Sequence, residues 1–230
     1  MAKYIVSIII PVLNEARIIK STLQKLVGNT GVEIIVVDGG SQDDTVNIVR
    51  QLGVKVISVC GTNRGMQMNA GAAIALGEIL LFLHGDTQLP PNYSQLIVQT
   101  LQAPQVVAGA FDLKIDGLDP ALRWLERLVK LRSRWWSLPY GDQAIFLSKQ
   151  VFEEIGEFSN LPIMEDFELI QRLKRKGKIA IAPGAVVTSG RRWQQLGVWK
   201  TTLINQLIII GYYLGVSPTK LRNFYRQQNK

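Results

Sequence analysis

The chain has 230 residues, of which 47% are hydrophobic and only one, Cys60, is a cysteine. This composition supports a sizeable core, and it excludes a disordered chain and an internal disulfide framework. We expect Cys60 to be a core residue. The net charge of +8 favours anionic partners, such as phosphates or an anionic membrane surface. A nucleic-acid partner is not expected, because the sequence has no basic motif interleaved with aromatic residues.

The first part of the chain alternates between strand and helix patterns. Apolar, β-branched runs at 4–10, 33–37 and 54–59 predict buried strands. A helix is expected to end near residue 27, and Ser41 is expected to be the N-cap of a second helix. This order predicts an α/β fold with a mostly parallel central sheet flanked by helices. The N-terminus leads straight into the first strand, so we expect no signal peptide and a cytoplasmic protein.

The fourth predicted strand ends in a group of chemically versatile residues. Residues 79–83 are all apolar, which is typical of a strand buried on both faces, and they follow a helix of small residues at 66–76. The apolar run ends at His84, Gly85 and Asp86. An acid just past the carboxyl end of a buried parallel strand lies where open α/β sheets bind ligands.

The second half has no clear linker, so we expect one continuous domain over residues 1–196. A basic amphipathic helix at 119–136 ends in Trp135 and Trp136. For this pair an acceptor platform, a membrane-edge anchor and core packing are all open interpretations. The other elements predicted after the fourth strand are helices at 90–102, 149–155 and 167–176 and strands at 106–115, 143–147, 179–182 and 186–187.

The C-terminal segment, 197–230, combines an apolar helix with a basic tail. Its uncharged part, 201–216, is shorter than the about 20 apolar residues that a membrane-spanning helix needs. We therefore expect a buried or interfacial helix that packs on the domain or lies at a membrane or dimer interface. The tail would suit an anionic surface or be a solvated end; its basic residues are Lys220, Arg222, Arg226 and Lys230.

Carboxylates follow several of the predicted strands. Asp38 ends the second strand and Asp86 follows the fourth, and the adjacent Gly39 and Gly85 would let backbone approach a ligand closely. One such acid is commonly a helix cap, but two on neighbouring strands favour a ligand-binding role. Further acids, at 142 and 165–166, lie in the later half.

Asp86 also suits a divalent cation. Hard cations favour oxygen ligands, whereas imidazole suits transition metals. His84, the only histidine, lies two residues before Asp86 and would face the same side of an extended strand end. We predict a divalent metal, Mn²⁺ or Mg²⁺, at Asp86 and His84, with a structural role for His84 as the alternative.

Several motifs occur together in an order that resembles the family 2 glycosyltransferases of GT-A fold. Residues 11–15 read Pro-Val-Leu-Asn-Glu, residues 37–45 read Val-Asp-Gly-Gly-Ser-Gln-Asp-Asp-Thr, and residues 63–65 read Asn-Arg-Gly, with Asn69 and Gly71 after them. The resemblance covers roughly residues 4–190.

Two later motifs extend this resemblance. The family's Asp-x-Asp motif corresponds to His84-Gly85-Asp86, and its Glu-Asp motif corresponds to Glu165-Asp166. The His-x-Asp variant, together with Arg-Arg-Trp at 191–193, also resembles a subgroup of small bacterial members described as arsenosugar-biosynthesis-like. That subgroup fixes no substrate.

The resemblance implies roles for the matching residues. Pro11 and Glu15 would line the nucleotide pocket, Asp38 would bind the base, and Asp86 would hold the metal on the diphosphate. His84 stands where relatives usually have an acid, which leaves the identity of the metal and strict metal dependence open. The complete set of predicted donor-binding residues is Pro11, Glu15, Asp38, Gly39, Arg64, Asn69, Gly85, Asp86, Asp142, Arg191, Arg192 and Trp193.

The later residues would complete the reaction. Asp142 would face the sugar or acceptor, and Asp166 would be the general base. Glu165 would point elsewhere or cap the following helix. The residues at 191–193 would clamp the diphosphate or stack on a sugar, with a surface loop as the alternative.

The implied activity is inverting transfer of a sugar from a nucleoside-diphosphate sugar to an acceptor hydroxyl, because one carboxylate base suffices for a single displacement. The alternative is a non-catalytic nucleotide-sugar-binding protein in which His84 marks a decayed metal site. A nucleotidyltransferase is less favoured, because its glycine- and lysine-rich N-terminal loop is missing from the sequence, and no Gly-x-Gly-x-x-Gly of a dinucleotide dehydrogenase follows the first strand. The acceptor is unknown. A lipid-linked acceptor, peripheral contact with the inner face of a membrane and a homodimer are all open.

Overall fold

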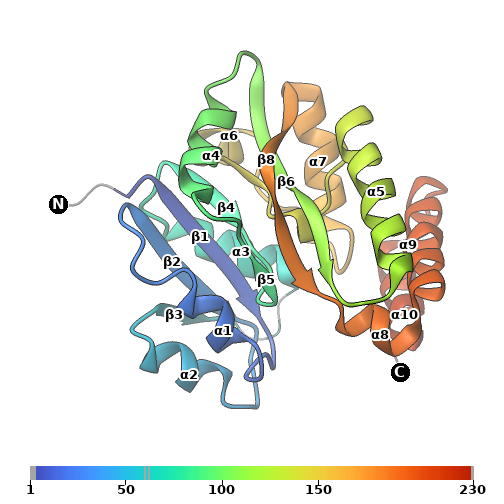
Figure 1. Cartoon of the computed structure of the whole chain (residues 1–230), viewed down its shortest axis with the longest axis horizontal. Helices are drawn as coiled ribbons and strands as arrows, with labels where there is room; N and C mark the ends of the chain where they lie inside the picture. The colour runs from blue at the N-terminus through green and yellow to red at the C-terminus, as the bar shows by residue number, and fades with distance from the viewer. Residues whose placement is uncertain (1–3, 60, 62, 229–230) are drawn as a thin grey trace.

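The computed structural model describes residues 4–59, 61 and 63–228, so Cys60 and Lys230 lie outside the described residues. One eight-stranded sheet has the order β3-β2-β1-β4-β7-β6-β8-β5 (Figure 1). Its strands are β1 (Val6–Val12), β2 (Val32–Asp38), β3 (Lys55–Ser58), β4 (Ile79–Phe82), β5 (Thr87–Gln88), β6 (Val106–Asp116), β7 (Phe146–Ser148) and β8 (Lys178–Ser189).

The expected mostly parallel sheet is confirmed. Of the strand pairings that join the described residues, four are parallel and three are antiparallel. Strands β1, β2, β3 and β4 all run the same way, so their carboxyl ends, including Asp38 and the residues after Phe82, meet at one edge. The antiparallel strand β7 then joins this parallel half to the longer strands β6 and β8.

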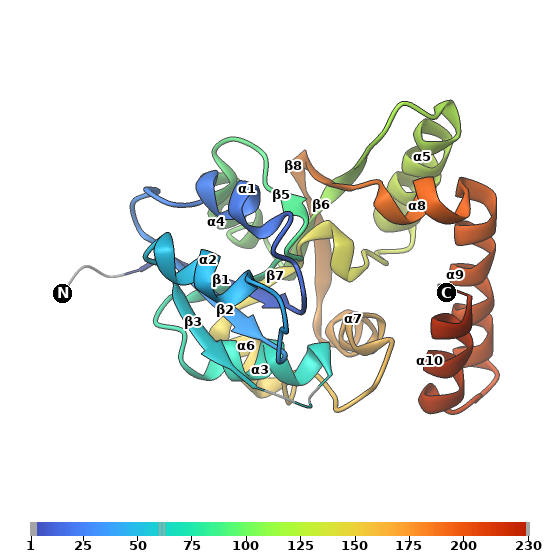
Figure 2. The ribbon, with the colours of Figure 1, turned by 90° about the horizontal axis from the view of Figure 1, so that it is seen from below.

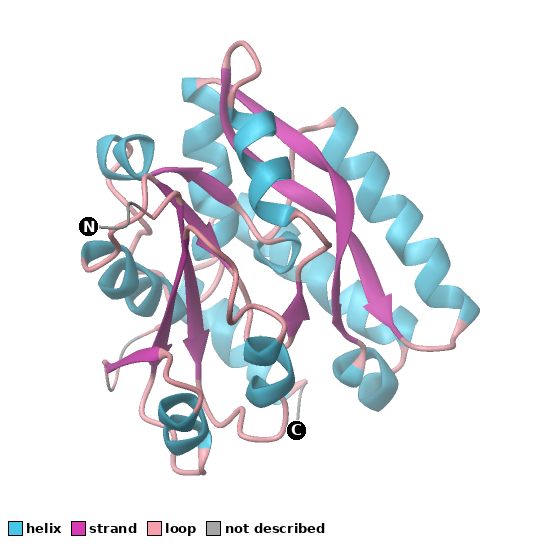
Figure 3. Ribbon diagram, turned by 60° about the vertical axis from the view of Figure 1, so that its left-hand side comes forward, coloured by secondary structure: helices cyan, strands magenta, loops and turns pink. Residues whose placement is uncertain are grey.

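Helices cover both faces of the sheet (Figure 3). Alternating side chains of β1 explain this arrangement, because Ile8 and Ile10 face one core cluster and Ile9 faces the other. The helices are α1 (Ile19–Gln24), α2 (Thr45–Gln51), α3 (Arg64–Ala73), α4 (Tyr93–Leu101), α5 (Pro120–Trp135), α6 (Lys149–Glu154), α7 (Glu165–Lys176), α8 (Arg191–Leu196), α9 (Val198–Tyr213) and α10 (Pro218–Gln227), with one 3₁₀ turn, η1 (Gly141–Gln143).

The first cluster lies under α1, α2, α4 and α5, and the second lies under α3, α6 and α7. The small residues of α3 allow it to lie very close to the sheet. A Cβ at Gly71 would come within 2.6 Å of Ile9 Cγ2. This contact fits the close packing that the sequence predicts for this helix.

Two local predictions were wrong. Helix α2 has Asp44, not Ser41, at its N-cap, and the Ser41 hydroxyl instead accepts a hydrogen bond from Asn14 N at 2.8 Å. The two short strands expected at 179–182 and 186–187 form the single strand β8, which bends at an irregularity of its pairing with β6. The sequence analysis did not predict strand β5. The residues at 191–193 begin α8, so the alternative interpretation of a surface loop there is wrong.

The C-terminal helices α9 and α10 lie at the end of the molecule remote from the N-terminus (Figure 2). Ile208 of α9 and Leu221 of α10 form a small core with Met164 and Phe167 at the start of α7. Within the described ranges, no helix is long and apolar enough to cross a membrane.

Candidate functional site

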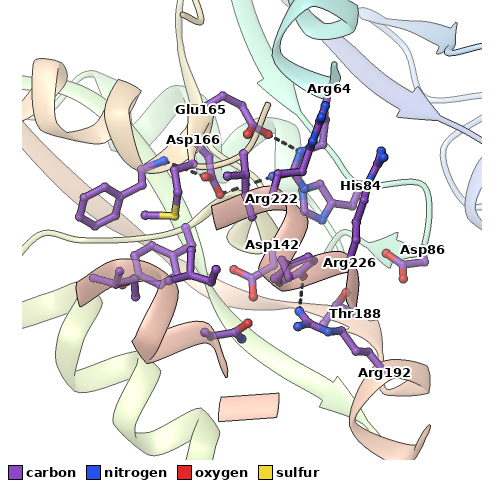
Figure 4. Close-up of a pocket in the computed structure, with 18 of the residues that line it drawn as sticks. Arg64, His84, Asp86, Asp142, Glu165, Asp166, Thr188, Arg192, Arg222 and Arg226 are labelled. Carbon is purple, nitrogen blue, oxygen red and sulfur yellow. Dashed lines mark hydrogen bonds and ion pairs between the residues drawn. The ribbon is translucent and has the colours of Figure 1, made fainter. Parts of the chain in front are cut away.

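A cavity of about 730 Å³ lies between the carboxyl edge of the sheet and the C-terminal helices. Its walls come from the loop after β4, from η1, from the start of α7 and from α8, α9 and α10 (Figure 4). The predicted site residues that line it are Arg64, His84, Asp86, Asp142, Asp166, Arg191, Arg192 and Trp193.

The other predicted residues do not line this cavity, and two of them are engaged elsewhere. Asp38 accepts hydrogen bonds from Gly40 N at 3.0 Å and Ser41 N at 3.1 Å, so it holds the turn after β2. The Asn69 side chain bonds both the N–H and the carbonyl of Phe158. The residues outside the cavity lining are Pro11, Glu15, Asp38, Gly39, Asn69 and Gly85.

Arg64 links three groups of the site. Its Nε donates to Glu165 at 2.5 Å, its Nη1 donates to His84 Nε2 at 3.1 Å, and its Nη2 lies 3.8 Å from Asp166 Oδ2. Burial alone would lower the pKa of Arg64, but Glu165 and Asp166 raise it above its usual value. A guanidinium only donates, so His84 Nε2 is the acceptor and the proton of the neutral ring is on Nδ1.

His84 is held in the neutral form. Burial and the adjacent positive charge of Arg64 lower the pKa of His84 to about 4, although Asp86 and Asp166 act in the opposite direction. Its imidazole therefore contributes no charge at neutral pH.

Asp166 sits at the N-terminus of α7, where the helix dipole favours a negative group. Its Oδ2 accepts a hydrogen bond from Gly141 N at 2.7 Å, and its Oδ1 accepts one from its neighbour Phe167 N at 2.8 Å. The contact with η1 needs a glycine, because a Cβ at Gly141 would meet Asp166 Oδ2 at 2.8 Å. These contacts fix one carboxylate at the cavity wall.

Asp86 lies on the opposite side of the cavity and is paired with Arg191. Arg191 Nη2 lies 3.3 Å from Asp86 and 3.1 Å from Glu15, so one guanidinium joins α8 to the loops after β1 and β4. The backbone supports this contact, because Ser189 N donates to Asp86 O at 3.1 Å beside the β5–β8 pair. Arg192 turns toward α10, where it bonds the Tyr225 hydroxyl and lies over the Tyr225 ring.

Comparison with known proteins identifies the family. The model of glycosyl transferase family 2 matches residues 7–159, which is more than half of the chain. The chain belongs to glycosyltransferase family 2. The assignment to the smaller arsenosugar-like subgroup stays a prediction.

Named relatives agree with this family. The chain is 32% identical over 126 residues to an uncharacterised glycosyltransferase of Nostoc sp., an alignment that covers 51% of this chain and 39% of the relative. It is 38% identical over 97 residues to a PGL/p-HBAD biosynthesis glycosyltransferase of Mycobacterium tuberculosis, covering 39% of this chain and 38% of that protein. The matches thus span about two fifths of the length of these curated relatives.

Solved structures show the same fold. A mannosyltransferase of Pyrobaculum calidifontis aligns with a TM-score of 0.63 at 23% identity, over 79% of this chain and 56% of that one. S. aureus TarS aligns with a TM-score of 0.66 at 16% identity, over 97% of this chain and 71% of that one. The GT-A fold predicted from the sequence is confirmed.

The metal prediction fits the glycosyltransferase site in part. Among the residues that the structure describes, no group of three or more His, Cys, Asp or Glu side chains could hold a metal ion. Asp86 nevertheless fits a cation that takes its other ligands from substrate phosphates and water, which is the usual mode of Mg²⁺. His84 does not fit in this arrangement, because its Nε2 lone pair faces Arg64.

Several residues of this glycosyltransferase site were not found from the sequence. Glu165 does not cap α7; it is buried and pairs with Arg64. The Gly141 N–H was also missed, and the only available signal was a glycine directly before Asp142. The missed lining from α9 and α10 comprises Asn205, Ile208, Ile209, Arg222, Tyr225 and Arg226.

The carboxyl group of Asp142 ionises less readily than that of an ordinary aspartate. Burial raises its pKa to about 6, with a further contribution from Asp166 and opposition from Arg132, and its buried Oδ1 has no hydrogen-bond partner among the described residues. Because its pKa is raised in the folded state, this group stabilises the fold at low pH and that contribution is lost as pH rises through about 6.

We predict that Asp142→Asn removes this loss. At each pH we compare the free energy of unfolding of the variant with that of the unmodified chain. This difference should shift in favour of the variant by about 1–2 kcal/mol from about pH 4 to about pH 8, a value that is reduced because the side chain is partly exposed. Urea unfolding across this range measures it. Two curves that run parallel with pH would show that Asp142 ionises normally.

Proposed function

We propose that the chain transfers a sugar from a nucleoside-diphosphate sugar to an acceptor hydroxyl, with inversion at the anomeric carbon. The observation that carries this proposal is the fixed carboxylate of Asp166, which faces a cavity shared with Asp86 and several arginines. Two of the solved structures support the choice of donor, since one is a complex of the Pyrobaculum enzyme with GDP-Man and Mn²⁺ and another is a complex of TarS with UDP-GlcNAc.

The reaction is a single displacement. The acceptor oxygen forms a bond to the anomeric carbon while the bond from that carbon to the diphosphate breaks, and the hydroxyl proton passes to Asp166. Arg64 and Gly141 N keep the base in place. Arg191 and Arg192 would stabilise the departing negative charge, and Trp193 would pack beside the sugar.

The donor would lie along the carboxyl edge of β1, β2 and β4. Pro11, Glu15, Asp38 and Gly39 would surround the nucleotide, with Arg64, Asn69 and Gly85 beside them. Asp142 Oδ1, which has no hydrogen-bond partner among the described residues, would accept a hydrogen bond from a sugar hydroxyl. A bound Mn²⁺ or Mg²⁺, held by Asp86, would supply neutralisation of the diphosphate charge.

Calorimetry of nucleoside diphosphates with Mn²⁺ or a chelator tests the donor site. We expect Mn²⁺ to strengthen binding, and Asp86→Ala to lose the metal-dependent part of the affinity, about tenfold or more. Asp116→Ala, an exposed acid outside the cavity lining, is the control. Equal affinities with metal and with chelator would show that Asp86 holds no metal.

The second candidate, a nucleotide-sugar-binding protein with a decayed metal site, is favoured by the contact between His84 and Arg64. Slow hydrolysis of the donor separates the two, because an active transferase leaks sugar to water. Donor binding without any hydrolysis or transfer would favour the binding protein. The cytoplasmic location stays a prediction.

A further inference from the structure

Helices α9 and α10 form the wall of the cavity farthest from the strands β1, β2 and β3 that would hold the nucleotide (Figure 2). Arg222 and Arg226 of α10 extend into the cavity, on the side where His84 and Asp166 lie (Figure 4). Their position places them on the acceptor side of the proposed base. Neither residue is a donor ligand in the proposed function.

The positive charge of this wall is not compensated. Nε and Nη2 of Arg192 and Nε of Arg222 are buried and have no hydrogen-bond partner among the described residues. Glu168 is the last acidic residue of the sequence, so α8, α9 and α10 contain no carboxylate. Both side chains are only partly buried, but a buried N–H donor without an acceptor is costly, and a bound anion would supply that acceptor.

The cavity's own acids do not supply that anion. Asp86 is paired with Arg191, and Glu165 and Asp166 interact with Arg64. The pKa of Asp142 is raised by burial, so its carboxyl group provides a negative charge less readily than an ordinary aspartate. A phosphate group of a substrate would satisfy the planar, multidentate donors of the arginines.

The outer side of α9 provides a second, independent observation, because it exposes apolar residues. Thr201, Ile204 and Ile208 are buried on the inner side, yet the opposite side is also apolar and is exposed. Five exposed apolar residues follow one stripe along the helix, beside the exposed Gln206, and they are Trp199, Leu203, Leu207, Ile210 and Leu214. A helix with apolar residues on two opposite sides normally has both of these sides covered.

Helix α5 shows a similar stripe, and it lies at the same end of the molecule, remote from the N-terminus (Figures 1 and 2). Its exposed apolar residues are Trp124, Leu128, Leu131 and Trp135. Exposed tryptophan and leucine together with basic side chains are typical of surfaces that lie in a lipid interface. A second copy of this chain is disfavoured as the cover, because α9 and α10 would bring only positive charges to the contact.

We propose that the acceptor is a lipid whose head group carries both a phosphate and a hydroxyl. Arg222 and Arg226 bind the phosphate, the hydroxyl faces Asp166, and the exposed stripe of α9 lies in an anionic bilayer. This inference rests on the proposed function, because it specifies the acceptor of that same reaction. It explains why one helix lines the cavity with one side and exposes apolar residues on the other.

Co-sedimentation with vesicles tests the inference. The unmodified chain should bind phosphatidylcholine vesicles containing phosphatidylglycerol, whose head group has a phosphate and hydroxyls, at least about tenfold better than phosphatidylcholine alone. Arg222→Gln/Arg226→Gln should lose most of this preference. The matched control is Arg17→Gln/Lys20→Gln, which removes the same charge from exposed positions on or beside α1 and should retain the preference.

The apolar stripe is tested separately. Leu203→Glu/Leu207→Glu should abolish binding to both kinds of vesicle, whereas Leu76→Glu, at an exposed leucine that follows α3, should not. Light scattering without vesicles tests whether a second copy of the chain covers the exposed stripe of α9 instead. A stable dimer that Leu203→Glu/Leu207→Glu dissociates would overturn the lipid role of α9.

Calorimetry of nucleoside diphosphates separates this inference from the donor site. If Arg222→Gln/Arg226→Gln weakens nucleotide affinity as much as vesicle binding, the arginines belong to the donor and the inference is wrong. Equal binding of this variant and its control to phosphatidylglycerol would also overturn it. Donor hydrolysis by the unmodified chain reports on the proposed function alone.

Discussion

Replacement of Asp166 by asparagine is expected to lower the rate of sugar transfer by about 10²–10⁴-fold while affinity for the nucleoside diphosphate is retained. The amide oxygen of asparagine can still accept the hydrogen bond from Gly141 N, which keeps the side chain in place. The variant loses the ability to take a proton, and its NH2 group also cannot accept the hydrogen bond from Phe167 N. Initial rates at saturating donor, together with calorimetry, measure the two quantities.

The control for this variant is Asp116→Asn, at an exposed position outside the cavity lining, which should transfer sugar at the normal rate. If Asp166→Asn were fully active, another group would have to accept the proton. If it lost nucleotide affinity in parallel with rate, Asp166 would serve binding rather than proton transfer.

Replacement of Arg64 by methionine should cost both stability and donor binding. Glu165 is 3% exposed and pairs with Arg64 at 2.5 Å, so the variant leaves a carboxylate buried without its partner. We expect the free energy of unfolding to fall by about 2–4 kcal/mol, less than for a completely buried pair because 40% of the Arg64 side chain is exposed. Urea denaturation measures this change.

A double variant distinguishes the two losses. Arg64→Met/Glu165→Met removes both charges and should recover most of the stability, but nucleotide affinity should stay low. Lys176→Met, which breaks an exposed ion pair with Glu154, is the matched control and should change stability by less than about 1 kcal/mol. No recovery in the double variant would mean that Arg64 stabilises the fold through other contacts.

The sequence was most informative where structure depends on nearby residues. The apolar runs of β1, β2 and β4 predicted buried parallel strands, and the acids that follow them were placed at the right edge of the sheet. The error at Ser41 has a physical explanation, because its hydroxyl is used by Asn14 N from a loop distant in sequence. A local capping pattern cannot include such a competitor.

The contacts that assemble the site are of the same long-range kind. Arg64 and Glu165 are 101 positions apart, and no spacing pattern predicts that they pair. The contribution of α10 was missed because its arginines look like a solvated tail until the packing of Ile208 and Leu221 turns them toward the cavity. Asp86, Asp142 and Asp166, which the sequence analysis proposed as site residues, all line the cavity.

The pairing of Arg191 with Glu15 also affects the order in which parts of the protein fold. These residues are 176 positions apart, so their contact closes a loop that includes most of the chain. Such a contact forms late, because the entropy of a long loop must be lost before the contact is gained. The parallel half of the sheet needs only residues up to β4, whereas the base and the arginine wall come from later segments. During synthesis the nascent chain would acquire the parallel half of its sheet before the later residues of the site, so a ribosome-bound intermediate would be partly structured but inactive.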